Sequence, residues 1–98
     1  MAFRLAPAAR DDLDAIWDYV AREARDAGPA DRLIDAITER LWLLAQHPQI
    51  GRRRDDLEAG LRSLAVGNFV IVYEVTAGNV SVLRIVHGRQ DLPSLFGG

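Results

Sequence analysis

The spacing of the apolar residues changes at His47-Pro48, and this change limits the folds open to the chain. Before it, apolar side chains recur every three or four residues, which places them on one face of a helix. After it come three short runs rich in β-branched and aromatic residues, as in strands. Proline disfavours helical backbone in the residue before it, so the helical part should end there. The pattern predicts an α+β fold with its helices first and most of its sheet second.

Two amphipathic helices are predicted before that point. The apolar stripe of the first one, which begins at about Pro7, consists of Leu13, Ile16, Trp17, Val20 and Ala24. Ala27-Gly28-Pro29 indicates a stop and a restart, with the second helix running from about Pro29 to Ala45. Acidic residues that complement the helix dipole are expected in the first turn of the first helix: Asp11, Asp12 and Asp14. Because the connector is so short, the helices should pack as an antiparallel hairpin.

Strands are predicted on both sides of the hairpin. Phe3-Arg4-Leu5 is a short strand signal, and a polar loop from Gln49 to Gly60 follows the second helix. Three more strands, separated by turn sequences, are expected at Leu61–Val66, Phe69–Val75 and Val80–His87. The predicted order is therefore β-α-α-β-β-β, with the helical hairpin packed on a small, mainly antiparallel sheet.

Length and composition fit one domain without disulfides. The chain has 98 residues, of which 49% are hydrophobic, so we expect a single domain over residues 1–98. It contains no cysteine, which excludes disulfides and cysteine-based metal sites. We see no secretion signal and no run of about 20 apolar residues, so a soluble cytoplasmic protein is expected. The net charge of −2 argues against general nucleic-acid binding, and all 12 basic residues are arginine.

The titratable residues of the helices have simple structural explanations. Asp14 and Asp18 lie one helical turn apart, but no histidine accompanies them, and Arg22 is spaced to pair with Asp18. We therefore expect no metal site, and nothing indicates a cofactor. His47 lies at the end of the second helix, where an imidazolium would stabilise the last carbonyl groups, and this favours capping over catalysis.

Two other groups of residues could bind a partner. Arg52-Arg53-Arg54 could grip phosphate, or it could be a solvated segment neutralised by the acidic residues after it, and the sequence leaves both interpretations open. Trp17 and Trp42 are expected to pack within the hairpin, although either could anchor a partner.

The last strands carry charged residues with two possible roles. Arg62 and Arg84 lie within strands, and Glu74 on the strand between them is a plausible partner, provided that the strand registers put all three side chains on one face. His87 and Arg89 could perform acid–base chemistry on a phosphodiester, with the arginine holding charge on the phosphorus intermediate. An ion pair between Arg89 and Asp91 that closes a loop explains the same residues equally well.

Several stretches, taken together and in order, resemble the ParE branch of the RelE/ParE toxin superfamily. They cover nearly the whole chain and consist of Arg10–Tyr19, His47–Arg52, Asp55–Ser63, Val70–Tyr73 and Leu83–Asp91. The superfamily comprises small toxins of type II toxin–antitoxin modules, known from plasmid stabilisation, and a cognate antitoxin holds each toxin inactive. RelE-like members cut messenger RNA on the ribosome. ParE-like members trap DNA gyrase with broken DNA.

The resemblance favours gyrase inhibition over RNA cleavage. The two nuclease lysines fall on Leu61 and Ser63, and an arginine of the next strand falls on Val70. The nuclease tyrosine falls near Leu95-Phe96, which has no hydroxyl group, and only Arg89 matches. The chain is therefore not expected to be an enzyme. The alternatives are a ribosome-dependent endoribonuclease that relies on His87 and Arg89, or a non-toxic relative that only binds antitoxin and modulates operon repression.

Two binding surfaces are predicted from the resemblance and the residue types. The target-facing surface is expected to consist of Arg62, Arg84, His87, Arg89 and Phe96. A ParD-like antitoxin, with a ribbon-helix-helix DNA-binding half and a half that folds on the toxin, is expected to contact Trp17, Tyr19, Val20, Trp42, Arg52, Arg53 and Arg54. We expect the two proteins to form a hetero-oligomer. The chain itself is not expected to bind specific DNA or a membrane.

Overall fold

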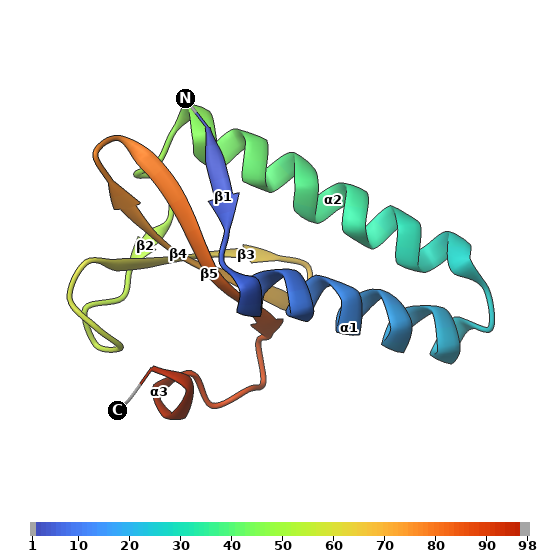
Figure 1. Cartoon of the computed structure of the whole chain (residues 1–98). Coiled ribbons are helices and arrows are strands. Elements are labelled where there is room, and N and C mark those ends of the chain that lie inside the picture. Colours follow the sequence, from blue (N-terminus) through green and yellow to red (C-terminus); the bar gives the residue numbers. More distant parts are fainter. Residues whose placement is uncertain (1, 97–98) are drawn as a thin grey trace.

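In the sequence, a helical hairpin lies between the first strand and the other four, and in the structure all five strands form one sheet (Figure 1). The computed structural model describes residues 2–96. Its elements are β1 (Phe3–Leu5), α1 (Pro7–Ala24), α2 (Ala27–Gln46), β2 (Arg52–Arg53), β3 (Leu61–Val66), β4 (Phe69–Thr76), β5 (Asn79–His87) and α3 (Leu92–Leu95). The predicted α+β order is confirmed, and β2 and α3 are additions to it.

The strands are arranged in the order β1-β5-β4-β3-β2. β1 runs parallel to β5, whereas the other neighbours are antiparallel, so the prediction of a mainly antiparallel sheet is confirmed. β1 is much shorter than β5: its last residue, Leu5, lies opposite Val82. The stretch of β5 from Leu83 to His87 therefore has β4 on one side and no strand on the other.

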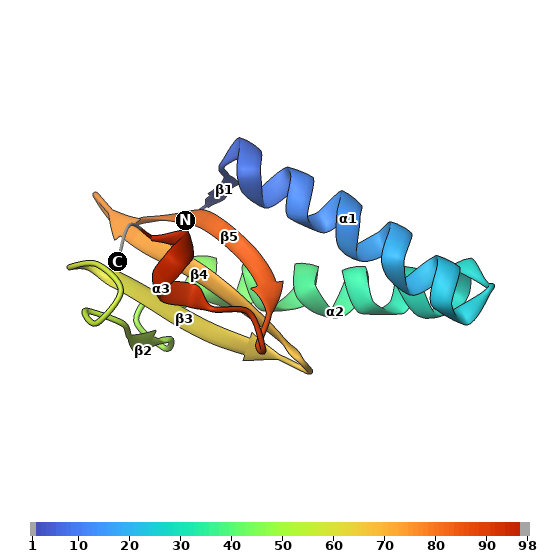
Figure 2. The ribbon, with the colours of Figure 1, turned by 90° about the horizontal axis from the view of Figure 1, so that it is seen from below.

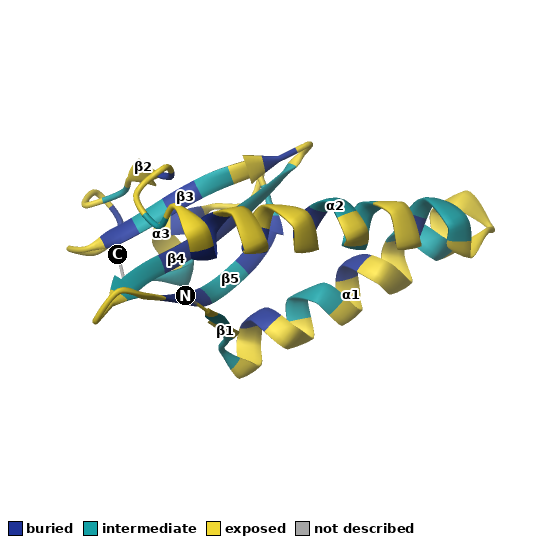
Figure 3. Ribbon diagram, turned by 90° about the horizontal axis from the view of Figure 1, so that it is seen from above, coloured by how far each residue is buried: buried dark blue, intermediate teal, exposed yellow. Residues whose placement is uncertain are grey.

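The two long helices cover one face of the sheet, and α3 lies on the opposite face (Figure 2). The main core lies between the hairpin and the sheet, and its largest fully buried side chains include Ile37, Leu41, Leu44, Ile71 and Tyr73. A second apolar cluster lies under α3 and consists of Leu57, Leu61, Val72, Val86 and Leu92. In Figure 3, buried stretches alternate with exposed ones along α1 and α2. Of the stripe predicted for α1, Leu13, Ile16 and Val20 pack in or against the main core, whereas Trp17 and Ala24 are exposed.

The hairpin is tighter than predicted. Arg25 ends α1 in a left-handed conformation, with φ of 54°, and α2 begins at Ala27 rather than at Pro29. Pro29 is tolerated within the first turn because an N–H group there has no partner inside the helix. Since α1 begins at Pro7, the acidic residues from Asp11 onward lie beyond its first turn, so that expectation was wrong. Within residues 2–96, no helix is long and apolar enough to cross a membrane.

The predicted loop after α2 is anchored to the sheet. Tyr73 is fully buried, and its hydroxyl donates to the Pro48 carbonyl at 2.8 Å and accepts from the Gly51 N–H at 2.9 Å. A Cβ atom on Gly51 would lie only 2.7 Å from Tyr73 Cε1, so this position requires glycine. Directly after it, Arg52 pairs with Ser63 across β2 and β3. The arginine segment therefore has a fixed backbone.

Candidate partner-binding surfaces

An apolar groove of about 500 Å³ lies between α1 and the open part of β5. Its α1 wall is a stripe at helical spacing, formed by Asp12, Ala15, Ile16 and Tyr19. The opposite wall includes Phe69 of β4, the end of β5, and Arg89 in the turn after it. We call this feature the α1–β5 groove. It brings Tyr19, predicted to contact the antitoxin, next to His87 and Arg89, predicted to face the target.

The inner end of the α1–β5 groove is closed by Asp12. Its carboxylate accepts two hydrogen bonds from Arg84, from Nε at 2.8 Å and from Nη2 at 2.9 Å. It also accepts the backbone N–H of Ile85 at 2.8 Å. The hydrogen bond from Arg84 to Asp12 raises the pKa of the guanidinium, because it favours the charged form. The expected pairing of Arg84 with Glu74 was wrong, because the carboxylate partner comes from α1.

Arg62 is also bound within the fold. Its Nη1 donates to the carbonyl oxygens of Gln49 at 3.2 Å and of Gly51 at 2.9 Å. Glu74 lies opposite Leu61 in the register of β3 and β4, while Arg62 lies opposite Tyr73, so the expected Arg62–Glu74 pair was wrong too. Arg62 instead helps Tyr73 to hold the segment that leads into β2.

His87 and Arg89 lie at the outer end of the groove. The imidazole Nδ1 of His87 accepts the backbone N–H of Arg89 at 3.1 Å. The ring also packs edge-on against Phe69, with 5.3 Å between the ring centroids. Arg89 is exposed, and it makes no ion pair with Asp91 or with another acidic residue in the described part of the chain. The Arg89–Asp91 ion pair, one of the two roles considered for these residues, is therefore absent from residues 2–96.

The three arginines of the segment after α2 differ in whether they form ion pairs with nearby aspartates. Arg53 donates to Asp55 at 2.8 Å and Arg54 to Asp56 at 3.1 Å, whereas the exposed Arg52 has no ion-pair partner among the residues that the structure covers. The pKa of Asp55 is lowered by the Gly60 N–H and then by Arg53, and that of Asp56 by its hydrogen bond to Arg54. Of the two interpretations from the sequence, neutralisation by acidic neighbours applies to the second and third arginines.

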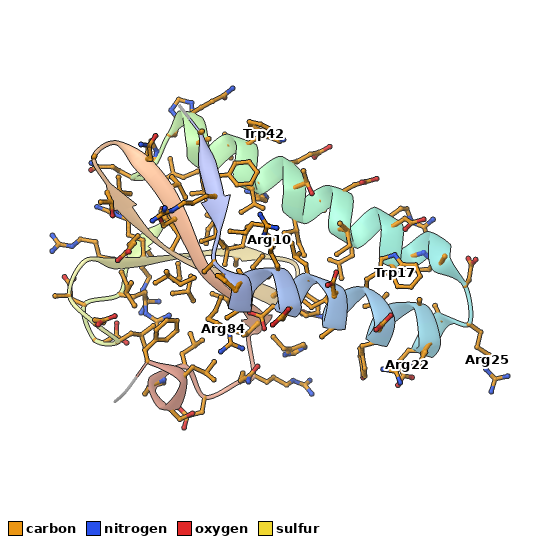
Figure 4. All side chains as sticks on the ribbon, in the orientation of Figure 1. Arg10, Trp17, Arg22, Arg25, Trp42 and Arg84 are labelled. Atoms are coloured by element: carbon orange, nitrogen blue, oxygen red, sulfur yellow. The ribbon has the colours of Figure 1, made fainter. Side chains whose placement is uncertain are left out.

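The hairpin carries a second exposed aromatic surface. Trp42 is 56% exposed and packs edge-on against Phe3, with 4.9 Å between the ring centroids. Trp17 is 36% exposed, and its indole N–H donates to Asp31 at 2.9 Å, which ties α1 to α2. Figure 4 shows Trp42 near β1 and Trp17 toward the tip of the hairpin, with Arg10 between them. We call Trp17, Trp42 and Phe3 the hairpin surface.

The other residues singled out from the sequence are not among those that define the groove or the hairpin surface. Val20 is half-buried and packs against the main core. Phe96 is half-buried and packs against the second apolar cluster, next to α3. Arg22 donates to the backbone carbonyl of Asp18 at 3.3 Å rather than to its carboxylate, so that expected ion pair was wrong. His47 is the C-cap residue of α2. No cluster of metal-ligating side chains occurs in residues 2–96.

Sequence reasoning missed the role of Asp12 and the groove that it closes. Asp12 and Arg84 are 72 positions apart, and no local pattern links them. A usable signal was the helical spacing of Asp12, Ala15 and Tyr19, which lie beside the core residue Ile16 on α1 and line the groove together with it.

Comparison with known proteins supports one family. The family described as ParE toxin of type II toxin-antitoxin system, parDE, matches residues 3–92. Toxin ParE1 of Mycobacterium tuberculosis is 31% identical over 91 residues, which cover 92% of each chain. Toxin RelE3 of Caulobacter vibrioides is 37% identical over 90 residues, which cover 88% of this chain and 92% of the relative. A solved structure described as the chromosomal ParDE TA system from P. aeruginosa has a TM-score of 0.76 at 26% identity, covering 89% of this chain and 95% of that one.

Proposed function

The chain belongs to the ParE toxin family of type II toxin–antitoxin systems, and we propose that it inhibits DNA gyrase and is neutralised by direct binding of a ParD-like antitoxin.

The gyrase proposal rests mainly on the residues that replace the cationic groups of RNA-cleaving relatives. Leu61 and Ser63 stand where the resemblance places lysines, and they are only 1% and 9% exposed. Val70, in place of an arginine, packs against the second apolar cluster. Buried uncharged side chains cannot stabilise the charge that develops on a phosphate during cleavage. This supports a toxin that acts by binding its target.

His87 and Arg89 form the centre of the proposed target-facing surface, with Tyr19 beside them in the α1–β5 groove. Arg62 and Arg84 are hydrogen-bonded within the fold, so we assign them a positioning role. Phe96 acts in the same indirect way, because it anchors the C-terminal segment on the sheet.

The antitoxin is proposed to bind the hairpin surface and the exposed arginine segment. Trp42 offers a large exposed ring, which suits contact with an apolar anchor of an amphipathic segment. Arg52 adds a guanidinium without an acidic partner in residues 2–96. Replacing Arg52, Arg53 and Arg54 by glutamate should weaken the complex in calorimetric titration. Unaltered affinity would remove this segment from the interface.

RNA cleavage is a second candidate, because one relative is named RelE3 and because His87 and Arg89 lie side by side. Two assays on the same purified protein separate the candidates. Supercoiling of relaxed plasmid by gyrase should fall as toxin is added and should recover when antitoxin is added. Primer extension on RNA from expressing cells should give no new 5′ ends. Normal supercoiling at a large excess of toxin, with new 5′ ends inside messages, would contradict the gyrase proposal.

A further inference from the structure

The turn after β5, at residues 88–90, has every backbone N–H group hydrogen-bonded. The Gly88 N–H donates to the Asn68 carbonyl at 2.7 Å, and the Gln90 N–H donates to the His87 carbonyl at 2.9 Å. Between them, the Arg89 N–H donates to Nδ1 of the His87 imidazole at 3.1 Å. Because all three donors are bound, the backbone of this turn is held in one conformation, and the Cα atom of Arg89 has a fixed place.

Only one of these three hydrogen bonds depends on a side chain, that of His87. Its pattern is that of an Asx-turn, in which a side-chain acceptor binds the N–H group two residues further on. The imidazole is held ready for this contact, because it packs edge-on against Phe69, with 5.3 Å between the ring centroids. Phe69 lies directly opposite His87 in the register of β4 and β5. His87 therefore fixes the backbone of Arg89 through a single side-chain atom.

Arg89 is placed where a partner can reach it from two sides. It lines the α1–β5 groove, and it also lines a smaller hollow of about 270 Å³ beside the turn between β3 and β4. Its side chain is exposed and makes no ion pair within residues 2–96. A guanidinium binds a carboxylate or a phosphate best when it is oriented to donate two parallel hydrogen bonds. A fixed backbone at Arg89 lowers the conformational entropy that is lost when such a contact forms.

We propose that His87 is a positioning residue, which holds Arg89 in place for the target through Nδ1 and does not itself act on the target. The inference rests on the proposed inhibition of gyrase. It divides the work of the target-facing surface, because Arg89 supplies the charge and His87 determines where that charge lies. It also differs from the acid–base role considered for His87. An acid–base residue must exchange a proton with its substrate, whereas a positioning residue needs only an acceptor at the place of Nδ1.

Asparagine and glutamine at position 87 distinguish these roles. In asparagine Oδ1 is bonded to Cγ, as Nδ1 is in histidine, so it can accept the Arg89 N–H, whereas the acceptor of glutamine lies one bond further out. Neither amide exchanges protons at neutral pH. His87→Gln should raise the toxin concentration that halves supercoiling by gyrase about fivefold, and His87→Asn should recover most of this loss. Arg89→Ala should raise the same concentration at least about tenfold, because one charge-assisted contact is lost.

A double-mutant cycle shows whether His87 acts through Arg89. In the Arg89→Ala background, His87→Gln should have no further effect, because no guanidinium is left to position. Arg25→Glu is the matched control, because Arg25 is exposed at the tip of the hairpin and points away from both surfaces (Figure 4). It should leave the inhibition of gyrase unchanged.

Amide hydrogen exchange of the free variants measures the positioning without the target. The Arg89 amide should exchange at least about tenfold faster in His87→Gln than in His87→Asn, because only asparagine replaces its acceptor. The Gly78 amide, in the turn between β4 and β5, is the internal control and should not change. His87→Leu keeps an apolar contact for Phe69 but has no acceptor, so it should behave as His87→Gln does. Urea denaturation of each variant separates loss of positioning from loss of folding.

Three results would overturn the inference and leave the proposed function standing. Equal loss of inhibition in His87→Asn and His87→Gln would mean that the ring itself meets the target or transfers a proton. Full inhibition by both variants would mean that the hydrogen bond is dispensable. A loss in His87→Gln that adds fully to that of Arg89→Ala would mean that the two residues act independently. Failure of the unmodified chain to inhibit gyrase would contradict the proposed function and this inference together.

Discussion

Asp12 is predicted to be the surface-proximal residue whose loss destabilises the fold most. Its carboxylate receives three hydrogen bonds, two from Arg84 and one from the Ile85 N–H, and the Asp12 and Arg84 side chains are 13% and 26% exposed. Asp12→Ala would leave a half-buried guanidinium without its partner and a backbone donor unpaired next to the core. Asp12→Asn keeps an acceptor for the Ile85 N–H and loses only the charge.

The expected cost follows from these contacts. An unpaired buried N–H costs about 1–3 kcal/mol, and breaking a buried ion pair by removing one partner costs about 3–5 kcal/mol. Because solvent screens this pair in part, we expect a loss of about 3 kcal/mol in the free energy of unfolding for Asp12→Ala, and about half of that for Asp12→Asn. Combined with Arg84→Met, Asp12→Ala should cost clearly less than the sum of the single changes, because the charge left unpaired is then gone.

Urea denaturation followed by circular dichroism measures these differences, with the slope of the transition as a check that the unfolded state is unchanged. Asp14→Ala is the matched control. Asp14 is an exposed aspartate on α1 that makes no ion pair within residues 2–96, so its loss should change the free energy of unfolding by less than about 0.5 kcal/mol. If Asp12→Ala cost no more than Asp14→Ala, the role given to Asp12 at the open edge of β5 would be refuted.

Three further changes test other parts of the structure. Gly51→Ala should cost about 2 kcal/mol in urea denaturation, because its Cβ would overlap the Tyr73 hydroxyl and lie 2.7 Å from Cε1. Tyr73→Phe removes that hydroxyl, so the cost of Gly51→Ala should be smaller in the double variant. Asp55 has a pKa below its ordinary 3.8 in the folded chain, so its contribution to stability is present above about pH 4 and is lost as the pH falls through the lower folded value. In acid titrations, Asp55→Asn should therefore make the loss of stability below about pH 4 less steep. Trp42→Ala should weaken antitoxin binding by about 2 kcal/mol in calorimetry, whereas Ile50→Ala, at a similarly exposed position, should not.

The long elements were predictable because local spacing determines them. Ile16 and Val20 on α1, and Ile37 and Leu44 on α2, all pack on or in the main core, as their intervals indicated. The second helix was predicted to end at about Ala45, before His47-Pro48, and it ends one residue later, at Gln46, with His47 as its C-cap. These signals depend on residues near one another in the chain, so no knowledge of the tertiary structure was needed.

The partners of the strand arginines were not predictable in this way. The register of β3 and β4 sets Arg62 opposite Tyr73 rather than Glu74, and a bulge between Val72 and Tyr73 shifts the pairing with β5. A shift of one residue moves a side chain to the other face of a sheet, and the sequence does not show where a bulge occurs. Arg84 binds instead the carboxylate of Asp12 on α1, 72 positions away, and no local pattern indicates that contact.

Several residues of the candidate surfaces were identified from the sequence, but the sequence did not show which of them lie on the same surface. Trp17 and Tyr19 were assigned to one antitoxin-binding set, yet two residues on a helix differ by about 200° around its axis. Trp17 accordingly binds Asp31 on α2, and Tyr19 lines the α1–β5 groove with His87.

DNA cleavage by gyrase in the presence of this protein tests the central claim most directly. Plasmid is incubated with gyrase and purified toxin, protein is removed, and the fraction of linear DNA is measured on a gel. We predict that linear DNA accumulates with the unmodified toxin, is suppressed by prior addition of antitoxin, and is strongly reduced with Arg89→Glu but not with Arg25→Glu. No accumulation of linear DNA with the unmodified toxin, at concentrations that stop growth in cells, would contradict the claim that this protein traps gyrase.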